Sequence, residues 1–236
     1  MADAGAVLVV GAGPGLGSAV ARRFSEAGMP VAVSTRTQKT VDDLAGQINR
    51  TGGISKGYVA DATDEDAVIS LFDQVEHDLG PLEVVVYNAG AFTRSSVIET
   101  SAEAFENCWK IGCFGGFLVA REAARRMLPR QQGTILITGA TAALRGSANF
   151  VNLAVGKFGL RALAQSMARE LGPEGIHVAH VIIDGVIAAQ HRDQSSHNPD
   201  ALLSPDAIAQ TYFELFSQHR SAWTLEIDLR PSVERF

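Results

Sequence analysis

The chain has 236 residues, of which 46% are hydrophobic and 19% charged, a balance that predicts one globular domain with a full core. Its formal net charge of -6 argues against nucleic acid or an anionic membrane as the main partner. No apolar run is long enough to cross a bilayer, and no signal segment opens the chain. Cys108 and Cys113 point in different directions on one predicted helix, which disfavours a disulfide. We therefore expect a soluble, cytoplasmic protein.

The first predicted elements are a buried strand over residues 7–10 and a helix over 18–27, joined by a glycine-rich loop. The loop holds four glycines: Gly11, Gly13, Gly15 and Gly17. Glycine permits a positive φ and lets an anionic ligand approach the main chain, and the following helix directs free N–H groups and its positive dipole end at that ligand. The stretch predicts a binding site for a dinucleotide pyrophosphate, with a glycine turn that binds nothing as the alternative.

Strands and helices then alternate along the chain. Further strands are predicted over residues 31–33, 55–59, 84–87, 134–138, 178–183 and 223–229. Helices are predicted over 40–50, 64–77, 100–128 and 151–171, and after Ser204, with Thr100 and Glu103 forming a capping box for the longest of them. This alternation predicts an α/β fold: a Rossmann-type, doubly wound parallel sheet of seven strands in a single domain spanning residues 1–236.

The spacing of the loop glycines resembles that of one protein family. The third glycine of a GxGxxG fingerprint would fall on Leu16, whereas the pattern GxxxGxG is matched by Gly11, Gly15 and Gly17. This pattern resembles the nucleotide loop of the short-chain dehydrogenase/reductase (SDR) family, and the resemblance runs from about Val7 to Leu229. It implies a NAD(P)-dependent oxidoreductase that acts on a carbonyl or alcohol group of a small molecule. The polar segment 188–203 is then either a substrate-covering loop or a plain surface loop.

Further cofactor contacts are expected at the carboxyl ends of the strands, where ligands of such sheets bind. The segment Ser34-Thr35-Arg36 offers no acidic residue to hold ribose hydroxyls, and Arg36 suits a 2′-phosphate, so we expect NADP in preference to NAD. Leu16, between the last two glycines of the loop, is included among the expected cofactor contacts. The resemblance implies contacts at three other strand ends: Asp61 and Ala62, then Asn88, Ala89 and Gly90, and finally Gly185 and Ile187. Asp184 stands where the family has a proline.

The Asn–Ser–Tyr–Lys tetrad of the family is mostly missing from this chain. Lys157 matches the lysine, but the tyrosine position holds Leu153, the serine position Ala140 and the asparagine position Gly112. None of these three side chains can donate a proton, and loss of a general acid costs about 10²–10⁴ in rate. The ordinary mechanism of the family is therefore not expected.

Three residues are candidates for the missing chemistry. Lys157 is expected to hold the nicotinamide ribose, and it could transfer a proton itself if burial lowered its pKa. Thr141 could hydrogen-bond a substrate carbonyl, and Arg145 could bind an anion at the mouth of the site. The alternative for each is a structural or solvent-facing role. No metal is expected, because His177 and His180 face opposite ways on one strand, and His191 and His197 lack companion ligands.

Small residues on the helices over 100–128 and 151–171 predict a homodimer or homotetramer, because the family pairs these two helices; packing within one subunit is the alternative. Three interpretations of function stay open. The chain is an atypical NADP-dependent oxidoreductase, an NADP(H)-binding sensor or partner subunit without turnover, or a scaffold that has lost the cofactor. The glycine loop, Arg36 and Lys157 argue against the third, and the resemblance favours the first.

Overall fold

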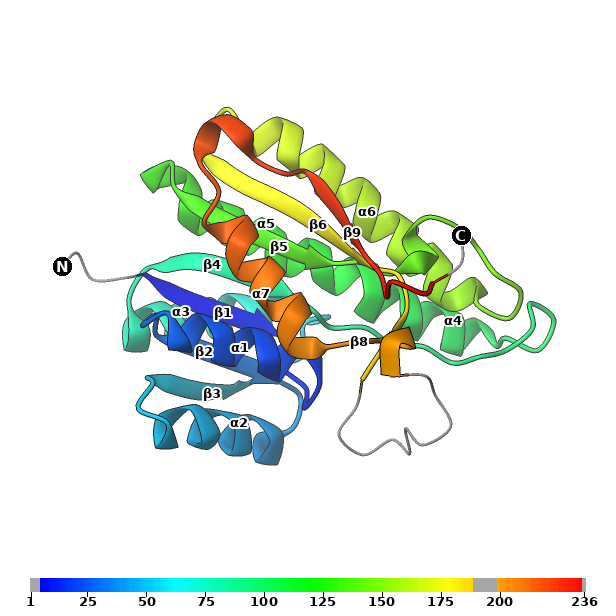
Figure 1. Cartoon of the computed structure of the whole chain (residues 1–236), viewed down its shortest axis with the longest axis horizontal. Coiled ribbons are helices and arrows are strands. Elements are labelled where there is room, and N and C mark those ends of the chain that lie inside the picture. The colour runs from blue at the N-terminus through cyan, green and yellow to red at the C-terminus, as the bar shows by residue number, and fades with distance from the viewer. Residues whose placement is uncertain (1–4, 189–198, 235–236) are drawn as a thin grey trace.

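A parallel sheet of seven strands runs through the middle of the molecule, with helices on both faces (Figure 1). The computed structural model describes residues 5–188 and 199–234. The strand order is β3-β2-β1-β4-β5-β6-β9, and all neighbouring pairs are parallel. The strands are β1 (Ala6–Val10), β2 (Val31–Thr35), β3 (Ser55–Val59), β4 (Leu82–Tyr87), β5 (Gly133–Thr138), β6 (Ile176–Ile183) and β9 (Glu226–Leu229). The predicted doubly wound, single-domain fold is confirmed.

The core lies in two layers, one on each face of the sheet. All residues of β1 are buried, and they alternate between the layers: Val7 and Val9 face one cluster, Leu8 and Val10 the other. The first face carries α1 (Leu16–Glu26), α2 (Gln38–Arg50) and α7 (Pro205–Phe216). The second carries α3 (Glu65–Leu79), α5 (Gly115–Met127) and α6 (Val151–Leu171). A strand that is buried on both faces needs this continuous apolar run.

The long helix expected over 100–128 is divided by a π-helical turn. The segment consists of α4 (Ala102–Trp109), the π turn η1 (Lys110–Phe114), α5 and a short 3₁₀ turn η2 (Leu128–Arg130). Inside the π turn the carbonyl of Ile111 accepts a hydrogen bond from the hydroxyl of the buried Tyr87. A π turn holds one extra residue, and apolar periodicity does not reveal it.

The expected capping box at the start of this helix is wrong by one residue. The Ser101 side chain caps α4 by accepting from the N–H of Ala104 at 3.1 Å. Thr100 instead donates its hydroxyl to the carbonyl of Ser96 at 2.7 Å. A local bond from a threonine to the backbone competes with capping, and here it takes the side chain away from the helix end.

The C-terminal part differs from the prediction in two places. The last strand begins at Glu226 and not at residue 223, because a 3₁₀ turn η5 (Arg220–Ala222) comes first and Trp223 stacks on His177, with ring centroids 4.9 Å apart. A small second sheet pairs β7 (Val186–Ile187) with β8 (Leu202–Leu203), and a 3₁₀ turn η4 (Pro199–Ala201) precedes β8. Most of the long loop expected over 188–203, with His191 and His197, lies outside the described residues.

Candidate cofactor and catalytic site

The glycine loop between β1 and α1 combines two tightly packed glycines with two open ones. Gly11 has a φ of +85°, and a Cβ on it would overlap the backbone of Ala89; a Cβ on Gly17 would lie 2.6 Å from the Gly11 carbonyl oxygen. A Cβ on Gly13 or Gly15, by contrast, would meet no atom of the described residues within 4 Å. The first pair therefore holds the loop against β4 and α1, and the second leaves open space at the start of α1 for an anionic ligand.

A cavity of about 270 Å³ opens beside this loop, at the carboxyl edge of the sheet. Its walls come from four strand ends and the π turn. The lining residues are Val10, Gly11, Gly13, Ser34, Thr35, Arg36, Ala60, Asp61, Ala62, Thr63, Asn88, Ala89, Gly90 and Ile111. Nine of the candidate cofactor residues are thus brought together: Gly11, Gly13, Ser34, Arg36, Asp61, Ala62, Asn88, Ala89 and Gly90. Ile111 was not foreseen from the sequence, because it enters the wall through the π turn.

Polar groups at the cavity wall are held in fixed positions. Asn88 donates from Nδ2 to the carbonyl of Gly11 at 2.9 Å and so ties the end of β4 to β1. Asp61 accepts from the N–H and the hydroxyl of Thr63 at 2.9 and 2.8 Å. Partial burial would raise the pKa of Asp61, but these hydrogen bonds and the charge of Arg36 outweigh it and lower the pKa, so the carboxylate is ionised.

The end of β2 carries a buried hydroxyl, that of Ser34, and an exposed guanidinium, that of Arg36. Oγ of Ser34 is buried and has no hydrogen-bond partner among the described residues. Arg36 lies two residues away and is exposed at the same wall. The exposed guanidinium at the end of β2 is chemically suited to a phosphate.

The remaining cofactor candidates lie outside this cavity. Gly15, Leu16 and Gly17 form the loop end and the first residues of α1. Gly185 follows β6, and a Cβ on it would lie 2.8 Å from Cδ of Pro231, so its role in the protein is to let the C-terminal segment pack closely. Ile187 belongs to β7 and packs against the core.

Lys157 projects from α6 to the end of β5 and is buried, with 6% of its surface exposed. Its Nζ donates to the carbonyl of Thr138 at 2.7 Å, and a Cβ on Gly90 would lie 3.9 Å from Nζ. Burial lowers the pKa of Lys157 to about 8. The ammonium therefore lies next to the cavity wall and titrates near neutral pH.

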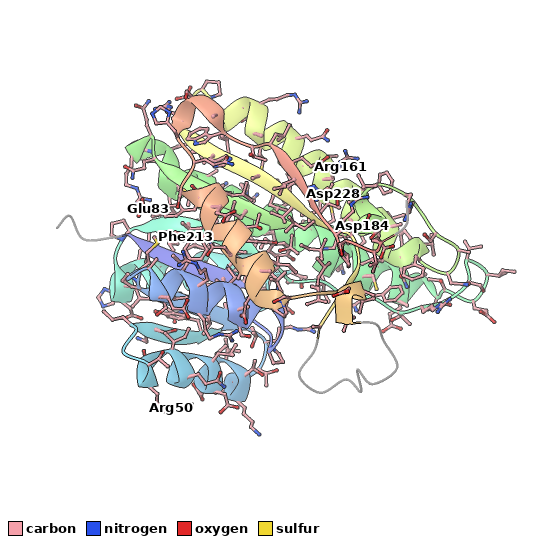
Figure 2. All side chains as sticks on the ribbon, in the orientation of Figure 1. Arg50, Glu83, Arg161, Asp184, Phe213 and Asp228 are labelled. Atoms are coloured by element: carbon pink, nitrogen blue, oxygen red, sulfur yellow. The ribbon has the colours of Figure 1, made fainter. Side chains whose placement is uncertain are left out.

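Thr141 and Arg145 have different surroundings. The Thr141 hydroxyl donates to Asp184, which also lies 3.7 Å from the guanidinium of Arg230. Figure 2 shows Asp184 and Asp228 near each other at the carboxyl ends of β6 and β9. Since the Thr141 proton is held by a carboxylate, Thr141 offers a ligand only acceptor lone pairs. Arg145 is exposed on the loop after the 3₁₀ turn η3 (Thr141–Ala143).

The small residues of η1, α5 and α6 serve packing within the chain. A Cβ on Gly112 would lie 3.7 Å from the Cα of Gly156, so these two glycines bring the π turn and α6 together. A Cβ on Gly116 would overlap Leu160. These glycines are explained without a partner chain. Four large apolar side chains stay exposed on α4, α5 and α6: Trp109, Phe117, Val155 and Phe158.

Comparison with known proteins decides the family. The sequence pattern described as short chain dehydrogenase matches residues 5–200. The chain belongs to the short-chain dehydrogenase family. The structure of a short-chain dehydrogenase from Rhodopseudomonas palustris is 39% identical, with a TM-score of 0.85 over 96% of this chain and 98% of that one.

Two further proteins are less similar to this chain in sequence. The 3-oxoacyl-[acyl-carrier-protein] reductase MabA of Mycobacterium avium is 35% identical over 77% of this chain and 66% of its own length. The chain therefore spans about two thirds of that relative. Actinorhodin polyketide ketoreductase, solved with NADPH, covers 99% of this chain with a TM-score of 0.90 at 20% identity, which shows the shared fold. Among the described helices none is long and apolar enough to cross a membrane, and the described residues hold no cluster of three or more metal-ligating side chains.

Proposed function

We propose that this protein is an NADP(H)-dependent oxidoreductase that interconverts a carbonyl and an alcohol on a small molecule, with Lys157 as the group that exchanges the proton. The observation that carries the proposal is the position of Lys157: a buried ammonium, held by Thr138 beside the cavity, with a pKa lowered to about 8. A general acid works best when its pKa lies near the operating pH. Mycobacterial relatives named as 3-oxoacyl reductases support the carbonyl class.

The residues around the cavity fit a dinucleotide. The open space beside Gly13 and Gly15, at the start of α1, would hold the pyrophosphate. Asp61 would accept a hydrogen bond from the adenine amino group, and residues 88–90 would contact the adenosine half of the cofactor. Arg36, exposed at the cavity wall, would hold the 2′-phosphate, which favours NADP over NAD. When bound, the cofactor supplies or accepts a hydride.

Lys157 has two tasks in this scheme. Its Nζ would contact the ribose next to the nicotinamide, and it would exchange a proton with the substrate oxygen. Leu153, one helical turn earlier, has no hydrogen-bonding group, so the proton of Lys157 is not shared with a tyrosine. Below about pH 8 the protonated amine acts as the acid in carbonyl reduction, and above it the free amine acts as the base in alcohol oxidation.

The second candidate function is an NADP(H)-binding sensor or partner subunit without turnover. It is favoured by Gly112, Ala140 and Leu153, which replace three groups of the family's tetrad. Calorimetric titration with NADPH and with NADH comes first: tight binding of NADPH and much weaker binding of NADH supports both candidates, and no binding of either overturns both. Transfer of deuteride from 4-deuterated NADPH to a panel of ketones and aldehydes then separates them, with Lys157→Met as the matched control. Binding without transfer supports the sensor.

Self-association through α4, α5 and α6 is part of the proposal. The packing of Gly112 on Gly156 removes the first reason for expecting it, but Phe117 and Phe158 remain 38% and 43% exposed on adjoining helices. Trp109, Phe114 and Phe117 form a stacked aromatic row beside them. An apolar face of this kind supports a homodimer or homotetramer.

A further inference from the structure

A chain of buried polar groups lies between α6 and the sheet, next to Lys157. His180, on β6, is completely buried, and its Nδ1 lies 3.0 Å from Oε2 of Glu226 on β9. Glu226 in turn accepts two hydrogen bonds of 2.7 Å from the guanidinium of Arg161. Lys157 and Arg161 are four residues apart on α6, so they lie on the same face of the helix. The His180 imidazole and the Glu226 carboxylate therefore lie between α6 and the sheet, on the helix face that carries Lys157.

The second nitrogen of His180 points to the end of β5. Nε2 is buried and has no hydrogen-bond partner among the residues that the structure describes. A Cβ on Gly139 would overlap this nitrogen, so the ring lies directly against the Gly139 backbone. Gly139 follows Thr138, whose carbonyl holds the ammonium of Lys157. Nε2 of His180 and Nζ of Lys157 thus contact two neighbouring residues, Gly139 and Thr138, at the end of β5.

The charges around His180 determine where its proton lies. Burial is the main cause that lowers the pKa of His180, the charges of Lys157 and Arg161 lower it further, and Glu226 opposes them. The pKa of Glu226 is lowered, chiefly by its hydrogen bonds from Arg161, so Glu226 is ionised and accepts. A neutral imidazole beside an ionised carboxylate carries its proton on Nδ1. Nε2 then holds a buried lone pair next to an ammonium.

We propose that His180 and Glu226 form a proton path that connects Lys157 with solvent, with one bound water between Nζ of Lys157 and Nε2 of His180. This inference rests on the proposed function. In alcohol oxidation the hydroxyl proton would go to the free amine of Lys157, and a bound NADP would supply the hydride acceptor. Nε2 then accepts a proton from Lys157 through the water, and Nδ1 releases its proton to Glu226, which is in part exposed and passes it to solvent. The ring then carries its proton on Nε2, so a flip of the neutral imidazole resets it for the next oxidation, and carbonyl reduction runs the same steps in reverse from the Nε2-protonated ring.

A buried histidine that merely packs in the core is the competing explanation, and the chain offers a control for it. His177 lies on the same strand but on the opposite face, stacked on Trp223 and hydrogen-bonded through Nε2 to the carbonyl of Thr224 at 2.9 Å. Both histidines are buried members of β6. Replacing His177 disturbs the strand to a similar extent and leaves the layer of Lys157 intact.

The test follows the proton of Lys157 directly, without cofactor or substrate. The sequence contains four lysines, Lys39, Lys56, Lys110 and Lys157, so ¹⁵N-labelled lysine gives few ammonium signals. The exchange rate of the Lys157 ammonium with water is measured by NMR at mildly acidic pH in the parent, His180→Phe, His180→Gln and His177→Phe. We expect exchange to slow at least about tenfold in both His180 variants, which lack a proton shuttle, and to stay at the parental rate in His177→Phe.

Two results would overturn the proposal: parental exchange in a folded His180 variant, or equal slowing in His177→Phe. His180→Gln keeps a polar side chain and serves if His180→Phe does not fold. The proposed function fails separately, because the NADPH titration of the parent does not depend on these variants.

Discussion

The ammonium of Lys157 lies 2.7 Å from the carbonyl oxygen of Thr138, whose hydroxyl is hydrogen-bonded at 2.7 Å to the hydroxyl of Tyr212 on α7. Through one residue at the end of β5, a charged side chain of α6 is connected to a helix on the opposite face of the sheet. The contact explains how Lys157 is buried although no carboxylate of the described residues pairs with it, because the carbonyl dipole of Thr138 stabilises the ammonium. The carbonyl offsets only part of the desolvation of the ammonium, and the pKa of Lys157 is therefore lowered.

The buried ammonium makes stability depend on pH. The pKa of Lys157 is about 8 in the folded chain and 10.5 as the ordinary value, so between these values the unfolded chain binds more protons and stability rises with pH. The destabilisation is complete below pH 8 and vanishes above 10.5. Between pH 7 and 10 the parent should gain about 2–3 kcal/mol relative to Lys157→Met in urea unfolding. The exposed Lys39→Met is the control, and an equal pH profile for parent and Lys157→Met contradicts the prediction.

Restoring the missing acid should raise turnover. Leu153→Tyr with Ala140→Ser places a phenol one turn before Lys157 and a hydroxyl before η3. Because a general acid contributes about 10²–10⁴ in rate, kcat/KM for carbonyl reduction should rise at least about tenfold. Leu153→Phe with Ala140→Ser has the same ring without the acid and is the control. If NADPH still binds and no gain appears, the substrate side of the site is closed as well.

The two kinds of glycine in the loop should respond differently to alanine. Gly11→Ala forces a Cβ into the Ala89 backbone at a positive φ, so it should destabilise the fold by about 2 kcal/mol or more. Gly13→Ala fills open space, and it should leave the melting temperature nearly unchanged but weaken NADPH binding. Calorimetric melting and NADPH titration of both variants check this; unchanged NADPH affinity in Gly13→Ala would exclude the loop as the pyrophosphate site.

Arg36 should decide between the two nicotinamide cofactors. Replacing it with glutamine removes one charged partner of the 2′-phosphate, worth about 1.5–3 kcal/mol, so the Kd for NADPH should rise about 10–100-fold and that for NADH should hardly change. Arg50→Gln, exposed and outside the cavity, is the matched control. An equal rise in Kd for NADPH and NADH would show that Arg36 contacts the adenosine that both cofactors share and not the 2′-phosphate.

The apolar face of α5 and α6 should hold copies of the chain together. Phe158→Glu places a charge on this face, and light scattering should then give the mass of one 25.0 kDa chain, whereas the parent gives a multiple. Val233→Glu, an exposed apolar residue elsewhere, should leave the parental mass unchanged. A monomeric parent contradicts the oligomer outright.

The sequence was informative wherever local chemistry determines structure. Buried strands ending in glycine or a polar residue, as at Val10 and Gly11, predicted the sheet and the cavity edge correctly. The sequence was uninformative where one extra residue or the pairing register of two strands determines which side chains come together. The π turn that brings Ile111 to the cavity is an example. His180 shows the same limit. Its alternation on β6 was predicted, but its partner Glu226 depends on how β6 pairs with β9, for which no local pattern exists.

The π turn between α4 and α5 interrupts regular α-helical hydrogen bonding, and its neighbours in the fold explain why it is present. Deleting one residue from 110–114 would restore unbroken α-helical hydrogen bonding and improve the helix by itself. The same deletion would leave α5 in phase but would remove the turn in which the Ile111 carbonyl accepts from Tyr87 and Ile111 lines the cavity. Length variants of this segment should therefore be poorly tolerated although it lies on a helix surface. A locally imperfect helix is kept because the wall of the neighbouring cavity includes a residue of the π turn itself.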